Sequence, residues 1–205
     1  MEHTVKAYSE ELNNLTAEVV RLGGLAEAQV ADSIVAFARR DLTVAQDLRR
    51  TVSAMKFAMQ LERCGDLAKN IAKRCLVLAE AEPLTPLTRS IERMGNLVAA
   101  RLKDVLDAYT SGNLDRAVAV WARDDEVDEH YNSLFRELLT YMMADPRTIN
   151  SCAHLLFIAK NLERIGDHAT NIAETVHYLI SGTPLTDERP KKDTSPMTSV
   201  EYKRA

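Results

Sequence analysis

The chain has few of the residues that interrupt helices or favour sheets. Its 205 residues include only seven glycines and six prolines, and aromatic residues make up 5% of the sequence. Glycine and proline are poor helix formers, and strands are enriched in aromatic side chains, so this composition predicts an all-helical protein. Hydrophobic residues reach 46%, which is enough to build the core of one or two small domains.

Other absences exclude whole classes of protein. The formal charge is −4 and no basic stripe could neutralise phosphates, so we expect no nucleic-acid partner. No apolar run approaches the roughly 18 residues of a membrane span, and no signal peptide opens the chain, so we expect a cytoplasmic protein. The three cysteines form no C-x-x-C pair. Because Cys64 and Cys75 occupy apolar positions, we interpret them as buried free thiols.

One stretch of twelve residues occurs twice with little change. LERCGDLAKNIA covers residues 61–72 and LERIGDHATNIA covers residues 162–173, an offset of 101. A second self-match, with an offset of 72, pairs residues 21–45 with residues 93–117. The offsets differ by 29 residues. The chain is therefore an internal duplication whose first half lacks about 29 residues, with the junction near residues 46 and 47.

Hydrophobic periodicity predicts that the duplicated segments are helical. From residue 155 to residue 179, apolar side chains recur at alternating spacings of three and four, which is a heptad pattern. The same pattern and the turn residues predict helices over about 10–45 and 47–81 in the first half. In the second half they predict one helix that ends at Ser111-Gly112-Asn113, followed by helices over about 114–144 and 148–181.

Two prolines, Pro83 and Pro86, mark a linker between the halves. We therefore predict two tandem three-helix bundles: the first over residues 1–82, lacking its middle helix, and the second over 83–183. Residues 184–205 are predicted to form a flexible tail. Two helices alone leave an apolar face uncovered, so either the intact chain is longer than this sequence or a partner covers the face.

Both copies of the repeated motif place two carboxylates four residues apart. They are Glu62 and Asp66 in the first copy, and Glu163 and Asp167 in the second. Like charges at this spacing cost a few tenths of a kcal/mol, and the glycine between them costs about 1 kcal/mol relative to alanine. A solvated polar face is one interpretation. Since both costs occur twice, a bound cation is the other.

A second acidic run falls inside the predicted helix 114–144. Residues 124–129 hold five carboxylates, and Asp124 and Asp128 again stand four residues apart. Packing between antiparallel helices could bring them to Glu163 and Asp167. Four carboxylates suit hard cations such as Mg²⁺, Mn²⁺ or Ca²⁺, or iron, better than zinc. The alternative is an acidic first turn of a helix, capped by Asp124. Spacing alone leaves both interpretations open.

The doubled motif L-E-R-x-G-D-x-A-x-N-I-A, together with D-E-V-D and A-D-P in the second half, resembles the PhoU family over nearly all of residues 1–183. The resemblance implies two three-helix bundles in a cytoplasmic protein that is usually a homodimer. It also implies negative regulation of phosphate uptake and of phosphate-starvation signalling. The implied partners are the phosphate ABC transporter and the phosphate-sensing histidine kinase, both of them membrane-associated.

The resemblance further implies metal binding through paired E(D)-x-x-x-D motifs. On this chain it points to six carboxylates as metal ligands: Glu62, Asp66, Asp124, Asp128, Glu163 and Asp167. The metal would be Mg, Mn or Fe, and no organic cofactor is expected. Because the first half lacks its middle helix, its metal site is at most half represented.

An enzymatic alternative is a di-iron oxidase built on a helical bundle. Such proteins need Glu-x-x-His from two helices plus further glutamates. Only Glu174 and His177 match, and the corresponding positions in the first copy are Lys73 and Leu76. Neither a glycine-rich phosphate loop nor a Ser-His-Asp arrangement is recognisable. We therefore predict that the protein is not an enzyme.

Overall fold

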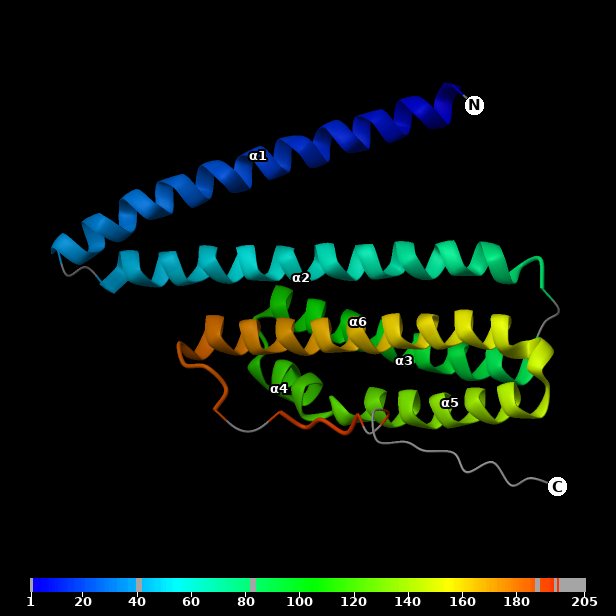
Figure 1. Cartoon of the computed structure of the whole chain (residues 1–205). Coiled ribbons are helices and arrows are strands. Elements are labelled where there is room, and N and C mark those ends of the chain that lie inside the picture. Colours follow the sequence, from blue (N-terminus) through cyan, green and yellow to red (C-terminus); the bar gives the residue numbers. More distant parts are fainter. Residues whose placement is uncertain (1, 40–41, 82–83, 187–188, 194, 196–205) are drawn as a thin grey trace. The chain divides into compact units, whose positions relative to one another are not determined.

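The computed structural model describes residues 2–39, 42–81, 84–186, 189–193 and 195, and the regular structure within these ranges is entirely helical (Figure 1). This confirms the predicted all-α fold. The helices, in chain order, are α1 (Glu2–Arg39), α2 (Leu42–Leu78), α3 (Thr85–Ser111), α4 (Leu114–Ala122), α5 (Asp125–Ala144), the short 3₁₀ helix η1 (Pro146–Thr148) and α6 (Ile149–Ser181).

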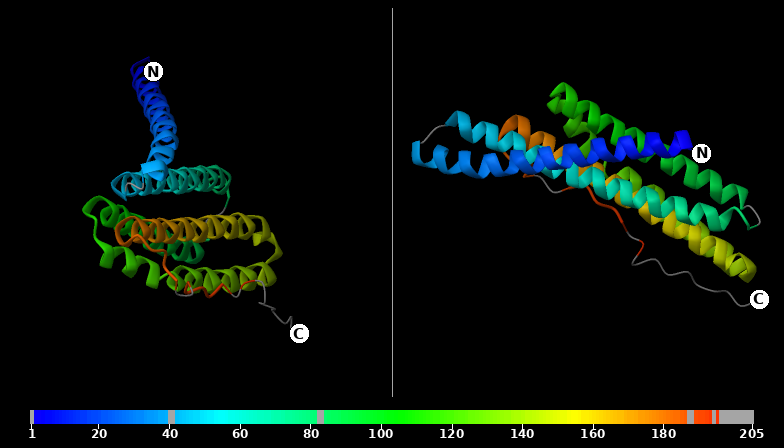
Figure 2. Two further views of the ribbon diagram at one scale, coloured as in Figure 1. Left: turned by 90° about the vertical axis from the view of Figure 1, so that its left-hand side faces the viewer. Right: turned by 90° about the horizontal axis from the view of Figure 1, so that it is seen from above.

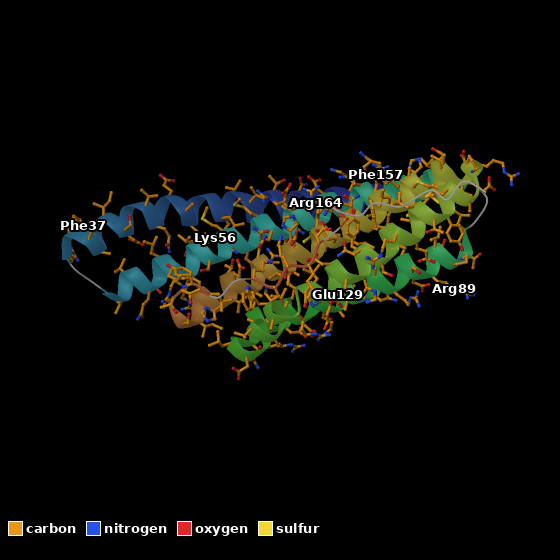
Figure 3. The ribbon with its side chains drawn as sticks, turned by 60° about the horizontal axis from the view of Figure 1, so that its bottom comes forward. Phe37, Lys56, Arg89, Glu129, Phe157 and Arg164 are labelled. Atoms are coloured by element: carbon orange, nitrogen blue, oxygen red, sulfur yellow. The ribbon has the colours of Figure 1, made fainter. Side chains whose placement is uncertain are left out.

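Two compact units divide the chain, residues 1–56 and residues 57–205. The first contains α1 and the beginning of α2, joined by the Gln29 side chain, whose Nε2 donates to Thr51 Oγ1 at 2.6 Å. Many apolar side chains of this unit remain exposed, and Phe37, 87% exposed, projects from the end of α1 (Figure 3). The others include Leu15, Val19, Val20, Val30 and Ile34. The expected apolar face of an incomplete bundle is therefore present.

The second unit is a bundle in which α6 packs against α3, α4 and α5 (Figure 2). Its core includes side chains with no measurable exposure, among them Leu87, Val105, Leu138, Ile172 and Val176. Six of the eight predicted heptad positions of α6 are buried, and Leu162 and Leu179 are partly buried, which confirms the seam predicted from the sequence. The second half is thus a helical bundle, as predicted.

The predicted helix 114–144 is broken into α4 and α5, so its continuity was wrongly predicted. α4 ends at Ala122, and α5 begins at Asp125 with an acidic first turn. Arg123 folds back across the break and pairs with Glu126, with Nε and Oε1 2.7 Å apart. Five carboxylates in mid-helix would repel one another, whereas at a helix N-terminus they meet the positive end of the helix dipole. The break therefore stabilises the acidic run.

The first two helices also differ from the prediction. Their junction was expected near residues 46 and 47, but both residues lie inside α2. The segment 42–52 contains neither glycine nor proline, so nothing local ends a helix there. The duplicate alignment marks where residues are missing from the sequence, and the helix continues through that position.

Residues 57–78 of α2 belong to the second unit. Phe57 stacks on Tyr109, with ring centroids 4.3 Å apart, while Cys64 and Leu67 are buried in its core. Cys75 is exposed, so the prediction that it is buried was wrong. It lies on the wall of an open apolar pocket of about 550 Å³ between α2, α3 and α6. No middle helix of a first bundle closes this pocket among the residues that the structure describes.

Candidate functional site: the acidic face of α5 and α6

Four of the six predicted ligands come from two adjoining helix segments. Asp124 immediately precedes α5, Asp128 lies in its first turn, and Glu163 and Asp167 lie in α6. The first three are between 4% and 6% exposed, which is unusual for carboxylates. Burial raises the pKa of Asp128, and the charges of Asp124 and Asp167 raise it further. We call these four residues the acidic face.

The glycine of the repeated motif explains how α5 and α6 come so close together. A Cβ atom on Gly166 would lie 3.3 Å from both Cγ1 and Cγ2 of Val127. Such contacts are shorter than the ordinary 3.5–4.0 Å between carbon atoms. Gly166 therefore leaves room for the close packing of Val127, a reason that the sequence did not reveal.

Asp124 does not cap α5 through its side chain, although the acidic first turn proposed as an alternative is present. Its carboxylate instead accepts a hydrogen bond from the buried Thr170, with Oγ1 and Oδ1 2.6 Å apart. Thr170 is on α6, so this bond ties the break between α4 and α5 to the neighbouring helix. In the first copy the matching residue is Lys69, whose Nζ donates to Asp66 of its own helix instead.

The remaining partner of Asp124 is an arginine from the C-terminal segment. Arg189 places Nε 2.6 Å from Asp124 Oδ2 and Nη2 2.6 Å from Asp167 Oδ1. Nη1 donates to Asn171 Oδ1 at 3.2 Å. Its guanidinium thus bridges the first residue of the acidic face to the last, at distances typical of charge-assisted hydrogen bonds.

Further contacts hold the residues that follow Arg189. We call residues 189–193 the basic segment; Figure 1 shows it in red alongside α4 and α5. The backbone N–H of Lys192 donates to Asp128 Oδ2 at 2.8 Å, and its carbonyl accepts from Asn132 Nδ2 at 2.6 Å. Lys192 Nζ also pairs with Glu129 (labelled in Figure 3) at 2.9 Å.

The predicted flexible tail thus includes a segment with specific partners in the bundle. Sequence reasoning missed Arg189 and Lys192 as residues of the site. The available signal was the run Arg-Pro-Lys-Lys, which is a concentrated basic stretch in an acidic protein. Nothing in that run indicates its partner, because Arg189 and Asp124 stand 65 residues apart.

Glu163 is the least satisfied member of the acidic face. Its Oε1 pairs with Lys160 Nζ at 3.0 Å, and Lys160 also reaches Asp193 at 3.2 Å. Its Oε2 is buried and has no hydrogen-bond partner within the described part of the chain. Burial raises the pKa of Glu163, with smaller contributions in the same direction from Asp167 and Asp128.

The first copy of the motif is solvated. Glu62 and Asp66 are exposed on α2, and Asp66 pairs with Lys69 of its own helix at 2.6 Å. That hydrogen bond lowers the pKa of Asp66. A Cβ atom on Gly65 would meet nothing within 4 Å, in contrast to Gly166. The two copies of one sequence motif therefore have different environments.

The four carboxylates of the acidic face match the oxygen ligands that hard cations prefer. In the described ranges, however, no group of three or more His, Cys, Asp and Glu side chains is arranged to hold a metal ion. Asp124 and Asp167 converge on the Arg189 guanidinium instead. Metal binding by the six predicted residues stays a prediction, and the geometry seen here fits an arginine.

The di-iron alternative finds no support in the geometry. Glu174 accepts a hydrogen bond from Trp121 Nε1 at 3.2 Å. His177 has its Nδ1 3.0 Å from the carbonyl oxygen of Thr183, at the C-terminal end of α6. Each side chain is therefore used at the edge of the bundle, and the pair does not join the acidic face.

Comparison with known proteins identifies relatives along most of the chain. The family model described as PhoU domain matches residues 26–75 and 91–176. The phosphate-specific transport system accessory protein PhoU homolog of Caulobacter vibrioides strain NA1000 is 60% identical, with 94% of this chain and 97% of that protein covered. The homolog of Rhizobium meliloti strain 1021 is 44% identical, with 97% and 98% covered.

Two solved structures share the fold. The crystal structure of PhoU from Pseudomonas aeruginosa superimposes with a TM-score of 0.66 at 32% identity, covering 86% of this chain and 100% of that one. The phosphate transport system regulatory protein PhoU from Streptococcus pneumoniae gives a TM-score of 0.63 at 26% identity, with 86% and 98% covered.

The alignment lengths independently indicate missing residues. The Caulobacter protein aligns over 224 positions, although 94% of this 205-residue chain is only about 193 residues. The difference, 224 − 193, is about 31 alignment positions at which the relative has a residue and this chain has none. This number is close to the 29 residues inferred from the internal duplication. Among the described residues, no helix is both long and apolar enough to cross a membrane. With two matches to the family model and relatives of up to 60% identity, the chain belongs to the PhoU family.

Proposed function

We propose that this protein is a non-enzymatic accessory protein of phosphate transport that restrains phosphate uptake. The observation that carries the proposal is 60% identity, over 94% of the chain, to a phosphate-specific transport system accessory protein. The name of the Streptococcus pneumoniae structure, a regulatory protein of the phosphate transport system, supports a regulatory role over a catalytic one.

The finer proposal concerns its partners. We infer that the protein acts in the cytoplasm, as a homodimer, on the phosphate ABC transporter and on the phosphate-sensing histidine kinase. It would lower phosphate uptake and silence the starvation response when phosphate is plentiful. The exposed apolar side chains of α1 support a protein partner, because contiguous apolar surface on a helix is typical of interaction sites. They include Leu15, Val19, Val30, Ile34 and Phe37.

A deletion and complementation experiment tests this proposal. Deleting the gene should raise the uptake of labelled phosphate in phosphate-rich medium and switch on a reporter driven by a starvation-induced promoter. Restoring the wild-type chain should reverse both effects. If uptake and reporter are unchanged by the deletion, the proposed regulation is wrong.

Two complementing variants then examine the acidic face. Asp167→Asn removes a carboxylate that contacts Arg189, whereas Asp66→Asn makes the same change at the matching, solvent-exposed position of the first copy. If the acidic face takes part in regulation, Asp167→Asn should complement poorly and Asp66→Asn should complement fully. Equal complementation by both variants would place the regulatory surface elsewhere. Co-purification of the transporter and the kinase with the tagged chain would identify the partner contacted.

A further inference from the structure

The acidic face already holds a cationic ligand, and that ligand comes from the same chain. Arg189 contacts both oxygens of Asp124, at 2.6 and 3.2 Å, and Asp167 Oδ1 at 2.6 Å. Lys191 Nζ approaches the same Asp167 oxygen to 3.2 Å. The side chain of Arg189 is only 20% exposed, so this bridge is largely removed from water. Ion pairs shielded in this way are much less weakened by salt than exposed ones.

Backbone contacts show that the basic segment is seated in one register. The N–H and the carbonyl of Lys192 are both engaged, by Asp128 and by the buried Asn132 respectively. Lys160 of α6 pairs with Asp193 at the next position. Charge attraction alone would not fix these main-chain groups, so the acidic face and Asn132 together form a binding site for an extended basic peptide.

Glu163 points to a second ligand for the same site. It is 6% exposed, and its Oε2 has no hydrogen-bond partner among the described residues. A buried carboxylate oxygen without a donor is costly, and a divalent cation is one ligand that would satisfy it. The carboxylate oxygens that such a cation would need, on Asp124 and Asp167, are the ones that Arg189 contacts.

We propose that the basic segment is a displaceable internal ligand of the acidic face, and that its docking and the binding of a divalent cation exclude each other. A divalent cation coordinated by these oxygens at about 2.0–2.6 Å would occupy the space that the Arg189 guanidinium fills and would repel its charge. A cation at this site would therefore release residues 189–193. Release would expose Arg189 and would free Lys191 and Lys192, which are already about half exposed, from their carboxylate partners. This inference goes beyond the proposed regulation of phosphate uptake and does not depend on it.

Limited digestion of the full-length protein with trypsin tests the docking. Trypsin cleaves after Lys191 and Lys192, and intact mass reports the rate. A synthetic peptide of residues 184–195 gives the rate for an unprotected segment. We expect the wild type to be cleaved at least tenfold more slowly than the peptide. Arg189→Gln, which lies outside the helices, should remove most of this protection; Asp66→Asn serves as the matched control and should not. Equal cleavage of the wild type and Arg189→Gln would overturn the proposal.

The cation is tested with Mn²⁺, using NaCl at equal ionic strength to account for screening. Mn²⁺ should accelerate cleavage of the wild type beyond the NaCl control. Thermodynamic linkage then requires Arg189→Gln to bind Mn²⁺ more tightly, by about tenfold in a calorimetric titration. If Mn²⁺ neither binds nor releases the segment, or binds both proteins equally, the mutual exclusion is wrong. Neither readout depends on phosphate uptake, so failure here is distinguishable from failure of the proposed function.

Discussion

The two motif glycines should respond in opposite ways to the same substitution. Gly65 and Gly166 occupy matching positions in the duplicated sequence, and each lies inside a helix. A Cβ atom on Gly65 would meet nothing within 4 Å, whereas one on Gly166 would press against two methyl carbons of Val127 at 3.3 Å. Replacing either by alanine therefore changes helix propensity equally but changes packing at only one site.

The magnitudes follow from these two effects. Alanine is favoured over glycine by about 1 kcal/mol in a helix interior, so Gly65→Ala should stabilise the second unit by about that amount. At residue 166 the same gain is opposed by overpacking, which typically costs about 1–3 kcal/mol. Gly166→Ala should therefore leave stability unchanged or lower it by up to about 2 kcal/mol. For a unit of this size, 1 kcal/mol shifts the melting temperature by roughly 2–4 °C.

Thermal and urea unfolding followed by circular dichroism would measure both variants. The double variant Gly166→Ala/Val127→Ala provides the control, because removing the valine methyls makes room for the new Cβ. The two substitutions should then be coupled favourably, by at least about 0.5 kcal/mol in a double-mutant cycle. A Gly166→Ala protein stabilised as much as Gly65→Ala, with no coupling to Val127, would refute the packing explanation.

Three further predictions concern thiols and pH. Burial raises the pKa of Cys64 to about 11 and also raises the pKa of Cys152, whereas Cys75 is exposed. A thiol reagent at pH 8 should therefore modify only Cys75 in the native protein and all three cysteines after unfolding. Burial lowers the pKa of His168, so its contribution to stability is present above pH 6.5 and is lost as the pH falls through its folded pKa. In His168→Leu the free energy of unfolding should therefore depend less on pH below pH 6.5 than in the wild type. Burial raises the pKa of Glu163. The stability that its protonated side chain contributes is therefore present below the unfolded pKa and is lost as the pH rises through the folded pKa. Glu163→Gln should be more stable than the wild type at pH 7, and urea titrations should show no such difference near pH 4. A pH-independent difference between either variant and the wild type would contradict these assignments.

Helices whose apolar residues repeat regularly were predicted best. The seam of α6 is buried as its heptads indicate, because a long periodic pattern has only one way to face a core. The break before Asp124 was missed because the apolar spacing continues across it, from Val120 to Val127. The crowding of carboxylates that favours a new helix N-terminus is instead an electrostatic effect. Periodicity describes which residues are buried, and charge here determines where a helix ends.

The candidate site was predicted only in part, because two of its determinants are long-range. The sequence indicated which carboxylates share a face, but it did not indicate that Arg189 lies among them. The glycine was interpreted as evidence for a cation, yet the contact of Gly166 with Val127 accounts for it without one. Exposure of Cys75 was also missed, because its helix position predicts burial only if another helix covers that side. Each error concerns a neighbour that is distant in the sequence or absent from it.

Trp121 makes this site accessible to spectroscopy. It is the only tryptophan of the chain, and it lies at the end of α4, three residues before Asp124. Its indole is 8% exposed and donates to Glu174 on α6. Tryptophan fluorescence, excited at a wavelength that the six tyrosines do not absorb, therefore originates at the break between α4 and α5. Any event that loosens this junction should shift the emission to longer wavelength, without a label or an engineered probe.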